Sequence, residues 1–70
     1  MTNAEILTLL KIDLQISATS LDTYLSTLID AARAFIAKEG ITLDDSAEDG
    51  LMVEMYAAYL YRKRRETDTG

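Results

Sequence analysis

The chain contains no cysteine, histidine, tryptophan or proline among its 70 residues. Without cysteine it has no disulfide, no thiolate metal ligand and no cysteine nucleophile. Without histidine it lacks the side chain that most often serves as a general base and as a transition-metal ligand. The sequence also contains no glycine-rich phosphate loop and no metal-ligand spacing. We therefore predict that the protein is not an enzyme and has no catalytic residue, metal site or cofactor.

Long apolar runs are also missing. The longest unbroken run, Met55 to Tyr61, is far shorter than the ~20 residues that span a bilayer. No basic stretch precedes the first apolar residues, as it would in a secretory signal. Hydrophobic residues nonetheless make up 49% of the chain. We expect one intracellular domain over residues 1–70, without membrane contact, near the size at which a single core only just stabilises a fold.

The first residues carry a helix-start signal. Thr2 and Glu5 have the Thr-x-x-Glu spacing of a capping box, and isoleucine and leucine residues follow them. Over residues 11–16 polar and apolar side chains alternate, which is typical of a strand. Because no second strand-like run is present to pair with this one, we predict a short N-terminal helix followed by an extended connection.

The second segment gives the clearest helix prediction. Apolar residues recur every three or four positions over residues 21–36, which places them on one face of a helix. Residues 19–22 have capping-box spacing at its start. Gly40 stands where a left-handed residue commonly ends a helix.

A third helix is predicted over residues 47–66, with Ser46 as its N-cap and a frayed tail over residues 67–70. Gly50 in its first turn indicates that another segment packs closely there. The fold class that follows is all-α: a small three-helix domain of two long antiparallel helices and a short N-terminal helix laid across them.

The third segment carries more apolar surface than one core can cover. Its predicted core stripe consists of Met52, Met55, Tyr56, Tyr59 and Leu60, and Val53 broadens it. Leu51 lies to one side of that stripe, and Tyr61 projects opposite Met52 at 100° per residue. Aromatic side chains with a polar tip are enriched at protein interfaces. We therefore predict Leu51 and Tyr61 at a subunit interface.

Charge is unevenly distributed within a net charge of −5. Acidic residues crowd residues 44–49, where a carboxylate pair or a cation site is one interpretation and a solvated helix N-terminus is the favoured one. All bases near the C-terminal end are consecutive: Arg62, Lys63, Arg64 and Arg65. They suit a helix C-terminus, and the net negative charge opposes duplex binding by a monomer. In a closed ring of subunits they would line an axial channel or pair with the neighbour's residues 44–49.

Three segments resemble a known protein family. Leu9 to Asp13 is similar to its leucine–basic–isoleucine–aspartate step after a first helix. Leu25 to Ile36 is similar to its middle helix, with a leucine–isoleucine pair, an alanine–arginine step and an aromatic–isoleucine close. Met55 to Arg64 resembles its last helix, which runs through tyrosines into arginines. In order and spacing these segments resemble the small head–tail connector proteins of tailed bacteriophages and prophages, also called head-completion or DNA-packaging adaptor proteins.

The resemblance implies a structural virion component that takes part in head completion and DNA packaging. Copies would form a homo-oligomeric ring beneath the phage portal protein, prolong the DNA channel and offer a surface to a tail-proximal connector or stopper protein. It implicates Arg33 and the run Arg62 to Arg65, with non-specific contact to packaged DNA. The location implied is the virion head–tail junction, and the host cytoplasm during assembly. Relatives commonly continue beyond the last helix with a further segment.

A second class of function is compatible with the same residues. A small helical regulatory or inhibitor protein would bind a host protein or nucleic acid, using its acidic face as a nucleic-acid mimic or its basic end for direct contact. Oligomeric state and binding to a DNA duplex at physiological salt distinguish this alternative from a connector.

Overall fold

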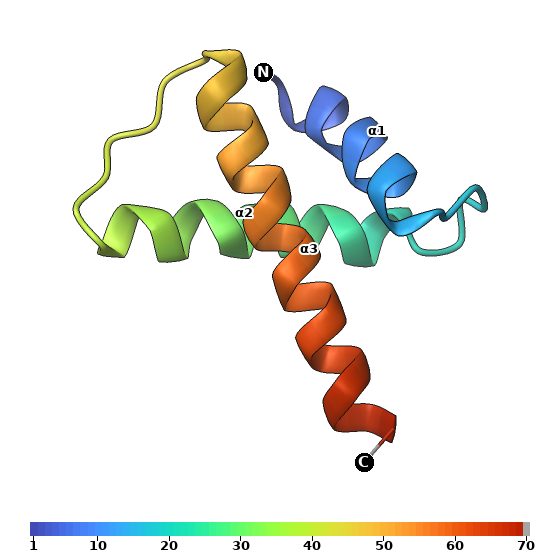
Figure 1. Cartoon of the computed structure of the whole chain (residues 1–70). Coiled ribbons are helices and arrows are strands. Elements are labelled where there is room, and N and C mark those ends of the chain that lie inside the picture. Colours follow the sequence, from blue (N-terminus) through green and yellow to red (C-terminus); the bar gives the residue numbers. More distant parts are fainter. Residues whose placement is uncertain (70) are drawn as a thin grey trace.

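A computed structural model of the chain describes residues 1–69, with side chains described as far as residue 66, and it contains three helices (Figure 1). The helices are α1 (Asn3–Leu14), α2 (Asp22–Lys38) and α3 (Ala47–Thr69). The predicted all-α, three-helix fold is confirmed. The fraying expected at residues 67–70 concerns residues outside the fully described part of the chain.

Helix α1 begins as its sequence indicates and ends later than predicted. Thr2 and Glu5 form a reciprocal capping box, in which the Glu5 backbone N–H donates to Thr2 Oγ1 at 3.2 Å and the Thr2 N–H donates to Glu5 Oε1 at 2.8 Å. The extended connection predicted from residue 11 is wrong, because α1 continues to Leu14 and ends at Gln15 in the left-handed region with φ of 58°. Leu14 lies four residues after the fully buried Leu10 and packs against the core, which favours one more helical turn.

Helix α2 ends as predicted but starts without the expected cap. Its N-cap is Leu21, which makes no side-chain cap hydrogen bond. The Asp22 carboxylate instead accepts a 2.6 Å bond from Lys11 Nζ on α1. At the other end Gly40 has φ of +86°, and its N–H donates to the Ala37 carbonyl at 3.0 Å. A left-handed glycine therefore terminates α2.

Helix α3 is capped by the segment before it. Ser46 Oγ accepts from the Asp49 N–H at 3.1 Å, and Asp49 Oδ2 accepts from the Asp44 N–H at 2.8 Å. Gly50 is buried, and a Cβ added there would overlap the Met1 side chain. The close packing predicted at this glycine is confirmed, because the chain start occupies the space that any larger residue would need.

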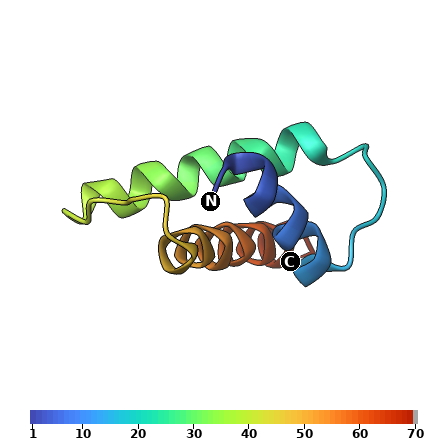
Figure 2. The ribbon, with the colours of Figure 1, turned by 90° about the horizontal axis from the view of Figure 1, so that it is seen from above.

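The two long helices cross instead of running antiparallel. Figure 1 shows α3 passing over α2 at a steep angle, with the N-terminus beside the start of α3, and Figure 2 shows the two helices in separate layers. The connection after α2 runs far enough for α3 to begin next to Met1, whose ammonium group donates to the Asp45 carbonyl. Small side chains from both helices, Ala32 and Ala57, are fully buried, and such residues let two crossing helices approach closely.

The core lies where the three helices meet. Its buried hydrophobic members are Ile6, Leu10, Leu25, Ile29, Ala32, Ile36, Val53, Ala57 and Ala58. On α2 the buried positions follow the stripe expected over residues 21–36, with spacings of three and four, except that Phe35 of this stripe is exposed. On α3, Val53 is buried as the sequence indicated, whereas Met55 and Tyr59 of the predicted stripe are exposed.

Candidate interaction surface

The side of α3 that faces away from the core is itself apolar. Leu51, Met55 and Tyr59 are 46%, 66% and 57% exposed. They follow one another at intervals of four residues, so they form a row along one side of the helix. The sequence placed Met55 and Tyr59 in the core stripe, and that prediction is wrong for both. Leu51 was predicted at an interface, and the structure leaves it exposed and available for one.

Aromatic rings from two helices widen this row. The Phe35 ring on α2 stacks on Tyr56 with centroids 5.9 Å apart, and Tyr59 meets Tyr56 edge-on at 6.0 Å. Phe35 remains 42% exposed, and Lys38 Nζ lies 5.7 Å from its ring centroid. We call the surface formed by Phe35, Leu51, Met55, Tyr56 and Tyr59 the outer face. Contiguous exposed apolar surface of this kind marks an interaction site in small soluble domains.

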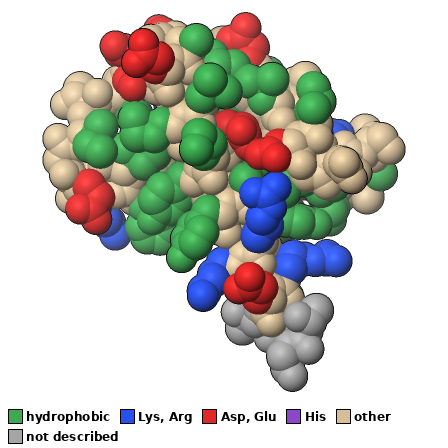
Figure 3. Space-filling view, in the orientation of Figure 1, with side chains coloured by type: hydrophobic (Ala, Val, Ile, Leu, Met, Phe, Trp, Pro, Cys, Tyr) green, Lys and Arg blue, Asp and Glu red, His purple; other side chains and the backbone are tan. Residues whose placement is uncertain are grey.

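Opposite charges lie at the two ends of the outer face. Figure 3 shows acidic side chains near the start of α3, hydrophobic side chains over α2 and α3, and basic side chains toward the C-terminal end. Arg62 NH2 donates to Asp13 Oδ1 on α1 at 3.2 Å. The Arg65 guanidinium lies 5.6 Å from the Tyr61 ring centroid. The predicted basic residues from Arg62 to Arg65 are all exposed.

A shallow hollow is present where the outer face meets the basic end. It has a volume of about 310 Å³ and is lined by Met55, Tyr59, Arg62, Lys63 and Glu66. Its walls combine the two most exposed apolar side chains of α3 with charged groups, so it can receive an apolar side chain that is accompanied by a charge.

Tyr61 does not face outward. Its ring is half-buried, packs against the core and lies 6.4 Å from the Tyr24 ring, centroid to centroid. Tyr61 was predicted at a subunit interface because it was expected to point away from the packed side of α3. That expectation about its direction is wrong. The packed side of α3 carries Val53, Ala57 and Ala58, and Tyr61 lies on that same side.

A buried carboxyl group, which sequence reasoning missed, joins α3 to α1. Glu54 is only 6% exposed, and its Oε2 atom has no hydrogen-bond partner among the described residues. Burial, reinforced by the neighbouring Asp13 carboxylate, raises the pKa of Glu54 to about 7. A hydrogen bond from Glu54, together with Arg62, lowers the pKa of Asp13. The pair therefore shares a proton under mildly acidic conditions, with Glu54 as donor and Asp13 as acceptor.

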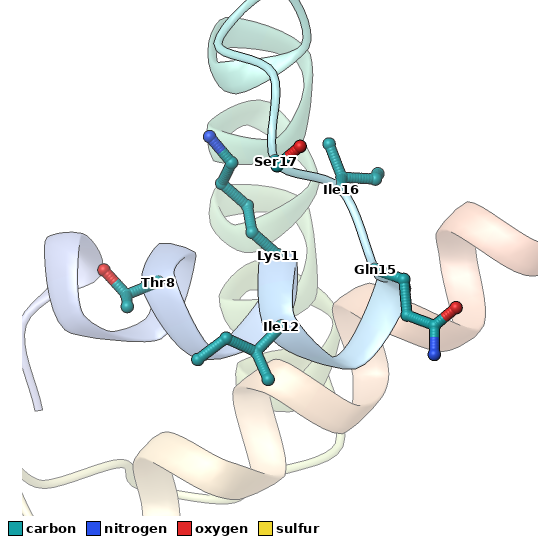
Figure 4. Close-up of a pocket in the computed structure, with 6 residues that line it drawn as sticks. All are labelled: Thr8, Lys11, Ile12, Gln15, Ile16 and Ser17. Carbon is teal, nitrogen blue, oxygen red and sulfur yellow. The ribbon is translucent and has the colours of Figure 1, made fainter.

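A second exposed apolar site lies at the end of α1. An open groove of about 560 Å³ is lined by Thr8, Lys11, Ile12, Gln15, Ile16 and Ser17, which Figure 4 shows on α1 and the segment after it. Ile12 is 69% exposed there. The sequence analysis assigned residues 11–16 to an extended connection and therefore did not place Ile12 on the exposed side of a helix.

Arg33 and the acidic segment have structural partners within the chain. Arg33 Nε donates to Asn3 Oδ1 at 2.8 Å, and Asn3 Nδ2 donates to Asp30 Oδ1 at 3.1 Å. These bonds fasten the start of α1 to α2. In the segment before α3, Asp44 Oδ1 accepts from the Ser46 N–H at 2.8 Å, and hydrogen bonding by Ser46 lowers the pKa of Asp44. These contacts favour the interpretation of the acidic segment as a helix cap.

Among the described residues no group of acidic side chains is placed to hold a metal ion. Over that same part of the chain, no helix combines the length and apolarity needed to cross a bilayer. Comparison with protein-family models, curated proteins and solved structures found no match to the chain.

Proposed function

We propose that this chain is a structural virion protein that forms a ring at the phage head–tail junction, between the portal protein and the tail, and extends the DNA channel. The observation that supports assembly is the outer face, where Leu51, Met55 and Tyr59 are each close to half exposed or more. A domain this small gains stability by covering such surface with copies of itself or with partners. The resemblance of its three segments to head–tail connector proteins supplies the particular assembly.

A ring requires two different patches on each subunit. Closed cyclic assemblies with more than two members use a head-to-tail contact, in which one patch of each copy meets another patch of the next. The outer face on α3 and the groove around Ile12 on α1 are separate exposed apolar sites. We propose that the outer face of one subunit packs against the α1 side of its neighbour.

The basic run would serve the channel or a neighbouring subunit. Arg62 to Arg65 lie together near one end of α3 and are exposed. Repeated around a ring they would make a positively charged belt, suited to non-specific contact with packaged DNA or to pairing with acidic residues 44–49 of the next copy. The work is mechanical and electrostatic, with no catalytic residue and no cofactor.

The experiment that tests this proposal images the protein with portal complexes of the same virus by electron microscopy. We expect a ring of additional density on the portal along the channel axis. Met55→Asp places a charge in the outer face and should abolish that density, whereas Thr23→Asp, on the exposed side of α2 away from that face, should not. Absence of added density with the parent chain, combined with a shift of a DNA duplex at physiological salt, would instead support a regulatory protein.

A further inference from the structure

We propose that the outer face of α3 binds a second copy of itself, in an antiparallel two-fold dimer centred on Met55. The occupant of this exposed face is therefore another molecule of the same chain. Three features of α3 support this dimer: the symmetry of its outward residues, its charge pattern and its hollow. The dimer does not depend on the proposed ring.

The outward residues of α3 are arranged symmetrically about Met55. Leu51 and Tyr59 lie four residues before and after it, and Glu48 and Arg62 lie seven residues before and after it. All five are exposed. In a two-fold contact a residue that meets a second residue is itself met by that second residue's copy. An antiparallel pair therefore places Met55 against Met55, Leu51 against Tyr59, and Glu48 against Arg62, each of the last two contacts occurring twice.

Charge selects this direction over the parallel one. Antiparallel packing brings the carboxylate of Glu48 to the guanidinium of Arg62 in the other copy. Parallel packing would place Glu48 against Glu48 and Arg62 against Arg62, and like charges across a contact are repulsive. Arg62 donates to Asp13 at 3.2 Å, and a guanidinium has five N–H donors. The existing ion pair therefore leaves donors for a second carboxylate.

The hollow on the outer face lies where the partner's leucine would arrive. It is formed by Met55, Tyr59, Arg62, Lys63 and Glu66. The antiparallel register sets the partner's Leu51 opposite Tyr59 and the partner's Glu48 opposite Arg62. An apolar side chain therefore meets the apolar wall of the hollow, and an acidic side chain meets its basic wall. Two equivalent hollows are filled in each dimer.

The contact is small, and it joins two copies only. One side of one helix, with Phe35 beside it, buries an area at the low end of specific interfaces, so dimerisation will depend on concentration. A two-fold contact uses the same patch on both copies and cannot propagate. Because the ring proposed above also uses the outer face, the dimer is a form of the free protein that must separate before ring assembly.

Single cysteines test this register, because the parent chain has none. Three variants, Met55→Cys, Leu51→Cys and Tyr59→Cys, would be treated with a short bismaleimide and analysed as covalent dimers by mass. We expect Met55→Cys to cross-link with itself. Leu51→Cys and Tyr59→Cys should each cross-link poorly alone and efficiently when mixed. Ile12→Cys, exposed on α1, is the matched control for collisions in solution.

The outcomes separate the alternatives. Self-linking of Leu51→Cys equal to that of the mixture would mean parallel packing and would overturn the proposal. Equal cross-linking of Ile12→Cys and Met55→Cys would mean non-specific collision and would also overturn it. Efficient linking of Leu51→Cys to Ile12→Cys without self-linking of Met55→Cys would show the ring contact instead. In sedimentation, Met55→Asp should raise the dimer dissociation constant at least about tenfold, with an unchanged helical spectrum.

Discussion

The two sides of α3 are both apolar, yet they use different residues for different purposes. The inner side, Val53, Ala57 and Ala58, is small and sealed against α1 and α2. The outer side carries the larger Leu51, Met55 and Tyr59 and leaves them exposed. Small residues let crossing helices approach closely, and α3 has them among its buried residues, although the larger, half-buried Tyr61 packs on the same side. The buried apolar residues of α3 are therefore smaller than those of its exposed row.

The largest expected effect comes from placing the same charge, an aspartate, on the inner and on the outer side of α3. Val53→Asp buries an unpaired carboxylate in the core and should lower the free energy of unfolding by at least about 3 kcal/mol, a large part of the total for a domain of this size. Met55→Asp, two residues away, should change it by less than about 0.5 kcal/mol. Urea denaturation followed by circular dichroism measures both. Similar losses at the two positions would contradict the assignment of the sides.

Two tyrosines provide a subtler contrast. Tyr61 packs on Tyr24 against the core, so Tyr61→Ala should cost about 2 kcal/mol of stability. Tyr59 is exposed, so Tyr59→Ala should cost less than about 0.5 kcal/mol while weakening self-association. Thermal denaturation and sedimentation of each variant give the two readouts. The interface hypothesis for Tyr61 regains support only if its loss leaves the melting temperature unchanged and weakens assembly.

The buried carboxyl group on the inner side gives stability a pH dependence. Burial raises the pKa of Glu54 from 4.5 to about 7, so between these values the folded state binds more protons than the unfolded state. Stability from this group is complete below pH 4.5 and is lost as the pH rises through 7. We expect the free energy of unfolding to fall across that interval, by less than the roughly 3 kcal/mol that the full pKa shift would give, and urea denaturation at a series of pH values measures this fall.

Two variants sharpen that measurement. Glu54→Gln removes the titrating group and keeps a donor for Asp13, so its stability should be nearly flat between pH 4.5 and 7. Asp13→Asn removes the neighbouring carboxylate and should reduce the slope without abolishing it, because burial remains the largest cause of the raised pKa. A parent chain whose stability rises over this interval would contradict the description of Glu54.

The smallest expected effect concerns the helix starts. Thr2 caps α1 through its side chain, so Thr2→Ala should cost about 1 kcal/mol. Thr19 has capping-box spacing before α2, but no side-chain cap bond is made at that helix start. Thr19→Ala should therefore cost less than about 0.5 kcal/mol. Comparable losses at both positions would mean that Thr19 also stabilises a helix start.

The sequence predicted the fold correctly where its apolar pattern allowed only one side of a helix to face the core. On α2 the apolar stripe faces a polar side, so only one orientation buries it, and Leu25, Ile29 and Ile36 are buried as expected. The box at Thr2 and Gly40 also act as predicted, since each is fixed by local backbone geometry, whereas the close packing predicted at Gly50 depends on the distant Met1. Local signals therefore established the helices and most of their ends.

The candidate site was less predictable because either of two apolar sides of α3 was able to face the core. With apolar residues on both sides, hydrophobicity favoured the stripe with the larger residues, Met55 and Tyr59, as the core. The crossing with α2 instead buries Ala57 and Ala58 beside Val53, and of these only Val53 was part of the predicted stripe. Glu54 lay inside an apolar stretch, and its neighbour Asp13 comes from α1, so the pattern of α3 alone did not show the pair. The sequence predicted surplus apolar surface, while tertiary packing decided which residues provide it.

The arrangement of the tyrosine rings has a practical consequence for spectroscopy. With no tryptophan present, the four tyrosines dominate the intrinsic ultraviolet emission. Tyr24 and Tyr61 form a pair in the folded interior, whereas Tyr56 and Tyr59 form a pair on the outside. In a variant with one pair replaced by phenylalanine, the tyrosine fluorescence comes only from the other pair. One variant would then report on unfolding and the other on contact with a partner, without an added label.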